Sequence, residues 1–70
     1  MKNNIKKLRK ELKLRQEDVA KSVNVTRQTI NAIENDKYDP SLELAMKLAR
    51  LLNTTVEELF VLEYIRLKSP

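Results

Sequence analysis

Residues 16–38, QEDVAKSVNVTRQTINAIENDKY, decide the fold of this chain. Apolar residues recur at helical spacing in two short runs, Val19, Ala20 and Val23 in the first and Ile30 and Ile33 in the second. Asn24 lies between the runs and tolerates the left-handed backbone conformation that a sharp turn between helices needs. The segment therefore predicts two amphipathic helices, about 16–23 and 26–35, joined by a tight turn.

The start of the second helix carries its own signal. Thr26 is a good N-cap, and Val25 before it can pack against Ile30 as a hydrophobic staple. The run Asn35-Asp36-Lys37 ends the helix.

The outward side of the second helix is polar but nearly uncharged. It presents amides, a small alanine and one arginine at its first turn: Arg27, Gln28, Asn31, Ala32 and Asn35. A solvated helix surface normally favours Lys and Glu, whereas amides and arginine form hydrogen bonds with base edges in the DNA major groove. The alternative is a surface that is merely hydrated, with Arg27 as an ordinary exposed arginine or a phosphate contact.

Three further helices are predicted around this pair. The first, residues 4–12, carries Ile5, Leu8 and Leu12 on one stripe. The second, residues 42–52, follows the cap Ser41 and buries Leu44, Ala45, Leu48, Ala49 and Leu52. The third is a short helix through Phe60 that begins with a Thr55–Glu58 capping box. Residues 61–68 fit either a strand paired with residues 2–5 or an extension of the last helix. The expected fold is all-α, with five helices and a possible two-stranded antiparallel sheet from the N- and C-terminal segments.

Four tight turns occur without any glycine. Asn24, Asp36 and Asn53 substitute well at positive φ because their side chains are short and polar. Lys13 substitutes less well, so we expect backbone strain there.

Size and composition exclude several classes of protein. The 70 residues predict one domain, 1–70, and the absence of Cys and His removes disulfides, the usual zinc ligands and the commonest general base. No acidic cluster stands out. We therefore expect no enzyme activity, no metal, no cofactor and no small-molecule ligand. No apolar stretch is long enough to cross a bilayer, and the basic N-terminus is not followed by a signal-peptide apolar run, which predicts a cytoplasmic or nucleoid-associated protein without a membrane partner.

The net charge of +4 is unevenly distributed. Residues 1–37 hold ten Lys and Arg against five acidic residues, whereas residues 38–70 hold four against five. A basic half beside a nearly neutral half favours a surface that faces a polyanion and a separate packing surface.

About residues 4–60 resemble the helix-turn-helix domain of phage repressors and Xre-type regulators. The resemblance rests on Gln16-Glu17-x-Val19-Ala20, Asn24-Val25-Thr26-Arg27-Gln28-Thr29-Ile30 and Ile33-Glu34-Asn35. With Tyr38-Asp39-Pro40-Ser41-Leu42, the chain looks closest to small stand-alone regulators of the cytolysin-repressor kind. The sequence departs from the family at Lys13, Asn24 and Asp36, where glycine is usual, and at Arg15, where Ser or Thr is common.

The resemblance implies that the helix beginning after Thr26 enters the major groove of double-stranded DNA. It also implies a homodimer that uses the terminal segments, including the tail 61–70, as a small sheet. Together with the residue pattern it predicts base contacts by Arg27, Gln28, Asn31 and Ala32. Phosphate contacts are predicted for Gln16, Thr26, Thr29, Asn35 and Lys37, the role of Gln16 being the one its counterpart has in the family.

Arg9 and Glu34 each lie on the apolar stripe of their helix. We expect them to meet as a partly buried ion pair that joins residues 4–12 to the second helix of the central segment, as in the phage repressors. Its role is either to orient that helix or to stabilise the structure only, and we favour the structural role.

The predicted function is a sequence-specific transcriptional regulator, most simply a repressor, that binds a palindromic operator as a symmetric dimer. One alternative is an antitoxin or a restriction-modification controller, which uses the same DNA chemistry. Another is a helical adaptor that binds only protein and lacks specific affinity for DNA.

Overall fold

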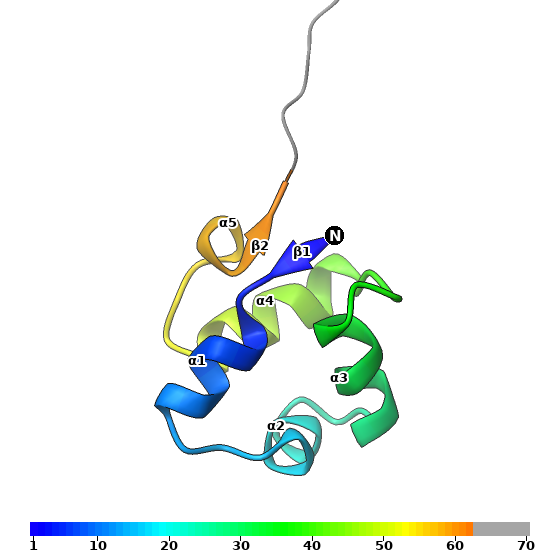
Figure 1. Cartoon of the computed structure of the whole chain (residues 1–70), viewed down its shortest axis with the longest axis vertical. Helices are drawn as coiled ribbons and strands as arrows, with labels where there is room; N and C mark the ends of the chain where they lie inside the picture. Colours follow the sequence, from blue (N-terminus) through cyan, green and yellow to red (C-terminus); the bar gives the residue numbers. More distant parts are fainter. Residues whose placement is uncertain (63–70) are drawn as a thin grey trace, which may run out of the picture.

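The computed structural model of the chain describes residues 1–62, in which five helices surround a small core and two short strands pair beside it (Figure 1). The elements are β1 (Lys2–Asn3), α1 (Ile5–Glu11), α2 (Gln16–Ser22), α3 (Arg27–Glu34), α4 (Leu42–Leu51), α5 (Val56–Leu59) and β2 (Phe60–Val61). This is the expected fold: mostly helical, with a small terminal sheet.

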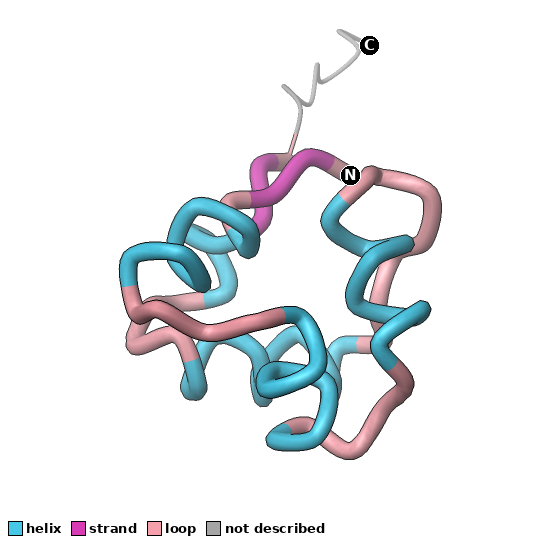
Figure 2. Tube along the Cα trace, turned by 60° about the horizontal axis from the view of Figure 1, so that its bottom comes forward, coloured by secondary structure: helices cyan, strands magenta, loops and turns pink. Residues whose placement is uncertain are grey.

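The two strands are antiparallel, with Lys2 opposite Val61 and Asn3 opposite Phe60. The backbone N–H of Asn4 extends the pairing by donating to the carbonyl of Leu59 at 2.8 Å. Both views show this sheet at the end of the molecule away from α2 (Figures 1 and 2). The second strand begins at Phe60, one residue before the predicted tail, and the predictions for residues 63–70 lie outside the described residues.

The core collects apolar side chains from every helix. Its buried residues are Ile5, Val19, Ala20, Val23, Ile30, Ile33, Ala45, Leu48, Ala49, Leu52, Leu59 and Phe60. Leu44, which the sequence predicts as buried, is only partly buried against this cluster, and Leu12 of the predicted stripe is 47% exposed. Because α1 ends at Glu11 and the chain turns at Lys13, the side chain of Leu12 does not continue the buried stripe of Ile5.

Side-chain caps begin three of the helices where the sequence predicts them. The hydroxyls of Thr26, Ser41 and Thr55 each accept a backbone N–H from three residues later, at 3.2 Å in all three cases. The start of α2 is stabilised differently. There the backbone N–H of Arg15 donates to the carboxylate of Asp18 at 2.8 Å, a contact that was not predicted from the sequence.

All four glycine-free turns have positive φ. The values are 58° at Lys13, 59° at Asn24, 60° at Asp36 and 59° at Asn53, as predicted. Asn and Asp adopt this conformation at modest cost, whereas the long side chain of Lys13 offers no local compensation. The turn before α2 is therefore the strained one.

Candidate nucleic-acid interface

One side of α3 is packed in the core and the other faces solvent. Ile30 and Ile33 are buried, while Arg27, Gln28 and Asn31 are exposed. This division follows from helical geometry, because residues three and four positions apart share a face. Thr29 and Ala32, at its edges, are half-buried. α2 packs against α3 more extensively than any other pair of described elements does.

The exposed side of α3 and the start of α2 enclose a shallow open hollow of about 530 Å³. All its lining residues belong to the predicted site: Gln16, Thr26, Arg27, Gln28 and Asn31. The hydroxyl of Thr29 lies 2.9 Å from that of Thr26, beside the same helix start. Asn35 and Lys37 lie beyond the other end of α3, both exposed. The fold thus brings most of the predicted residues to one surface and places the remaining two at its far end.

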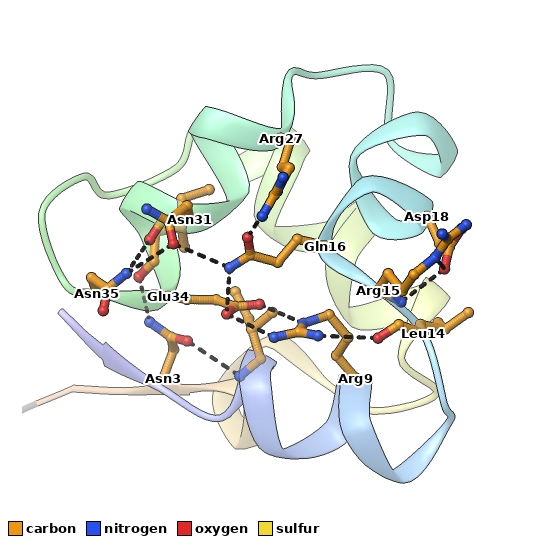
Figure 3. Close-up of polar contacts among 12 residues, drawn as sticks. Asn3, Arg9, Leu14, Arg15, Gln16, Asp18, Arg27, Asn31, Glu34 and Asn35 are labelled. Atoms are coloured by element: carbon orange, nitrogen blue, oxygen red, sulfur yellow. Dashed lines mark hydrogen bonds and ion pairs between the residues drawn. The ribbon is translucent and has the colours of Figure 1, made fainter.

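The side chain of Gln16 links α2 to α3 within this surface (Figure 3). Its amide nitrogen donates to Asn31 Oδ1 at 3.2 Å and to Glu34 Oε1 at 3.0 Å. Its amide oxygen accepts from Arg27 Nε at 3.4 Å. Asn35 completes the set by donating to the carbonyl and to the side-chain oxygen of Asn31, at 2.8 and 3.2 Å.

Beneath Gln16, Arg9 and Glu34 form a two-pronged ion pair between α1 and α3. Arg9 Nε lies 2.8 Å from Glu34 Oε2, and Arg9 Nη2 lies 3.1 Å from Glu34 Oε1. The two side chains are only 10% and 3% exposed. The third nitrogen of the guanidinium donates to the carbonyl of Leu14 at 3.1 Å, which ties in the turn before α2 (Figure 3). The pair joins α1 to α3, the two helices that its residues were expected to join.

Arg15 is a cation near this surface that is not among the site residues predicted from the sequence. It lines a second hollow of about 420 Å³ together with Gln16, Glu17, Arg27 and Arg9. The hydrogen bond from its guanidinium lowers the pKa of Asp18, and the hydrogen bond from its backbone N–H lowers it further. The same pairing raises the pKa of Arg15. Its position directly before Gln16 was the signal available in the sequence.

Neither a metal-binding cluster nor a membrane-spanning helix is found in the described part of the chain. Residues 1–62 hold no group of three or more His, Cys, Asp or Glu arranged to bind a metal ion. In the same part of the chain, each helix is too short or too polar to cross a bilayer.

A tight turn at Asn24, a capped second helix and an exposed polar side on that helix define a helix-turn-helix domain. The sequence model of the helix-turn-helix family matches residues 5–59. The chain belongs to this family, the Xre and phage-repressor type of Cro and cI, whose members are DNA-binding transcriptional regulators.

Similar proteins of nearly the same length occur in archaea and bacteria. An uncharacterised HTH-type transcriptional regulator of Methanocaldococcus jannaschii is 51% identical over 63 residues, which cover 90% of this chain and 96% of the relative. A second, from Methanothermobacter thermautotrophicus, is 48% identical over 64 residues, with 90% and 93% covered. A third, from Bacillus subtilis, is 44% identical over 63 residues, with 90% and 96% covered.

Proposed function

We propose that this protein is a sequence-specific repressor that binds a palindromic operator in double-stranded DNA as a homodimer, with α3 in the major groove. The observation that carries the proposal is the exposed side of α3, which holds Arg27, Gln28 and Asn31 over a buried apolar side. A surface of arginine and amides matches the donors and acceptors of base edges. Such a protein would act in the cytoplasm, at the nucleoid.

Each residue of the surface has a role suited to its chemistry. Arg27 carries a planar fork for the two acceptors of guanine, Gln28 and Asn31 supply amides for base edges, and Ala32 offers a methyl surface to thymine. Phosphate contacts by the backbone N–H of Gln16 at the start of α2, and by Thr26, Thr29, Asn35 and Lys37, would fix the register on the duplex without reading sequence.

A homodimer is supported by an apolar surface formed at the start of α4 and beside β2. A hollow of about 260 Å³ lies beside the sheet, lined by Met1, Asp39, Pro40, Leu42, Ala45, Val56 and Phe60. Leu42 is 70% exposed, and Val61 and Leu62 at the end of β2 are also exposed. Exposed apolar side chains of this kind are suited to association with a second copy of the chain. A symmetric pair formed there would present two copies of α3 to half-sites about 34 Å apart.

The test compares three alanine variants on an operator selected from random duplexes. Arg27→Ala and Gln28→Ala each lower specific affinity by roughly 1–3 kcal/mol and relax the preference at one base pair. Lys37→Ala, the control for a phosphate contact, weakens binding to all sequences similarly. If none of the variants changes sequence preference, α3 does not read bases. If the wild type shows only weak non-specific affinity for duplexes, a protein-binding adaptor becomes the better account.

A further inference from the structure

The orientation of the Gln16 side chain is fixed by neighbours that cannot exchange roles. A carboxylate only accepts hydrogen bonds and a guanidinium only donates them. Gln16 must therefore turn its nitrogen toward Glu34 and its oxygen toward Arg27, as the distances of 3.0 and 3.4 Å require. A flipped amide would form neither hydrogen bond.

The orientation of the Asn31 side-chain amide is fixed in the same way. Asn35 Nδ2 lies 2.8 Å from the backbone carbonyl of Asn31, which can only accept, so the side-chain nitrogen of Asn35 faces Asn31 as a donor. The same nitrogen also lies 3.2 Å from Asn31 Oδ1. Gln16 donates to that same oxygen at 3.2 Å. With two donors on its oxygen, Asn31 leaves its Nδ2 without a partner among residues 1–62.

Arg27 is held in a comparable way. Its Nε is engaged by Gln16, while Nη1 and Nη2 have no hydrogen-bond partner within the described part of the chain. The two terminal nitrogens are the ones that a guanidinium presents end-on to guanine O6 and N7. The groups that Arg27 and Asn31 offer to solvent are therefore donors.

We propose that Glu34 is a positioning residue for DNA reading: through Gln16 it fixes the position of Arg27 and orients the amide of Asn31 as a donor, so that both select guanine in the operator. This inference rests on the proposed function and assigns it a base preference. Guanine presents two acceptors side by side in the major groove, whereas adenine presents one acceptor and one donor. An asparagine pairs with adenine through both ends of its amide, and here the oxygen of Asn31 is already occupied.

The experiment removes the carboxylate without leaving a buried charge. Arg9→Met/Glu34→Leu replaces the ion pair by apolar side chains, and its folding is checked by circular dichroism and denaturant unfolding. Lys47→Met/Glu43→Leu is the matched control, because it makes the same kinds of change in an exposed pair on α4 whose atoms lie 3.5 Å apart. Arg27→Ala and Asn31→Ala locate the base pair that each residue contacts.

The wild type and the control variant are expected to prefer guanine at both pairs. In Arg9→Met/Glu34→Leu, Gln16 loses the acceptor that fixes its orientation, and preference for guanine over adenine falls roughly 5- to 100-fold at the Asn31 pair. The oxygen of Asn31 then keeps only Asn35 as a donor and can also accept from adenine. Discrimination at the Arg27 pair falls as well. Gln16→Leu, which interrupts the same link without touching the ion pair, shows both losses and provides the test if the double variant does not fold. Adding Gln16→Leu to Arg27→Ala produces no further loss at the Arg27 pair.

Two outcomes separate this inference from the function on which it rests. If Arg27→Ala and Asn31→Ala each relax one base pair but Gln16→Leu and the folded double variant keep full guanine preference, Glu34 is structural only and the proposed function stands. Adenine selected by the wild type at the Asn31 pair would also overturn the inference. If Arg27→Ala and Asn31→Ala change no preference at all, base reading by α3 is itself wrong.

Discussion

Replacing Arg9 by methionine removes the cation that neutralises the buried carboxylate of Glu34. That carboxylate is 3% exposed and accepts two hydrogen bonds from Arg9, at 2.8 and 3.1 Å. After the replacement, the amide of Gln16 still donates to it at 3.0 Å, but its charge is uncompensated. Breaking a buried pair in this way costs on the order of 3–5 kcal/mol. A domain of 70 residues has a total stability of only about 3.5–10 kcal/mol, so Arg9→Met removes a large part of it.

The companion variant Arg9→Met/Glu34→Leu separates the cost of an unpaired buried charge from the cost of removing hydrogen bonds. Apolar replacement of a complete buried pair is often neutral or stabilising. In this protein the carbonyl of Leu14 is also deprived of a donor at 3.1 Å, which costs about 1 kcal/mol. Urea unfolding followed by circular dichroism should therefore place the double variant within about 1 kcal/mol of the wild type, far above Arg9→Met. Equal stability of the single and double variants would refute the burial argument.

Three further predictions concern individual residues. Glycine adopts the positive φ of 58° at position 13 without strain, so Lys13→Gly raises the free energy of unfolding by about 0.5–1 kcal/mol. The control Lys7→Gly, at an exposed position within α1, lowers the free energy of unfolding by about 1 kcal/mol. An equal decrease in both variants would argue against strain at Lys13. The lowered pKa of Asp18 means that its charge stabilises the fold above the unfolded pKa of about 3.9, and that this contribution is lost as pH falls through the lower folded value. The stability gap between wild type and Asp18→Asn should accordingly close below about pH 4, and a gap that persists in acid would contradict the assignment. Lys37→Ala should reduce the slope of log affinity against log salt concentration by about 1, the share of a single phosphate neutralised by one lysine; an unchanged slope would mean that Lys37 does not bind phosphate.

Local signals explain most of what the sequence predicts about the fold. Thr26 and Ser41 cap their helices because a hydroxyl before an apolar run has a donor three residues ahead. Asn24 turns the chain because its short side chain tolerates positive φ. Helical spacing alone does not reveal that α1 ends at Glu11, one residue before Leu12.

The sequence predicts which residues share the surface of the site, but it does not predict the hydrogen bonds among them. Helical spacing places Arg27, Gln28 and Asn31 on one side of α3, and the apolar stripes bring Arg9 to Glu34. The bonds of Gln16 to Asn31 and Glu34 depend on how closely α2 and α3 pack, which no local pattern encodes. Asn3, whose amide donates to the carbonyl of Ile33 at 2.8 Å and so joins β1 to the end of α3, is a similar case, since its partner is 30 positions away in sequence.

Selection of bound duplexes from a random pool tests the central claim most directly, because it asks whether α3 reads bases at all. The account predicts a palindrome whose half-sites lie about one helical turn, 10–10.5 base pairs, apart and contain guanine. It also predicts that random DNA competes poorly against the selected operator. A pool that yields no shared sequence, or random DNA that competes as well as the selected duplex, would contradict the account.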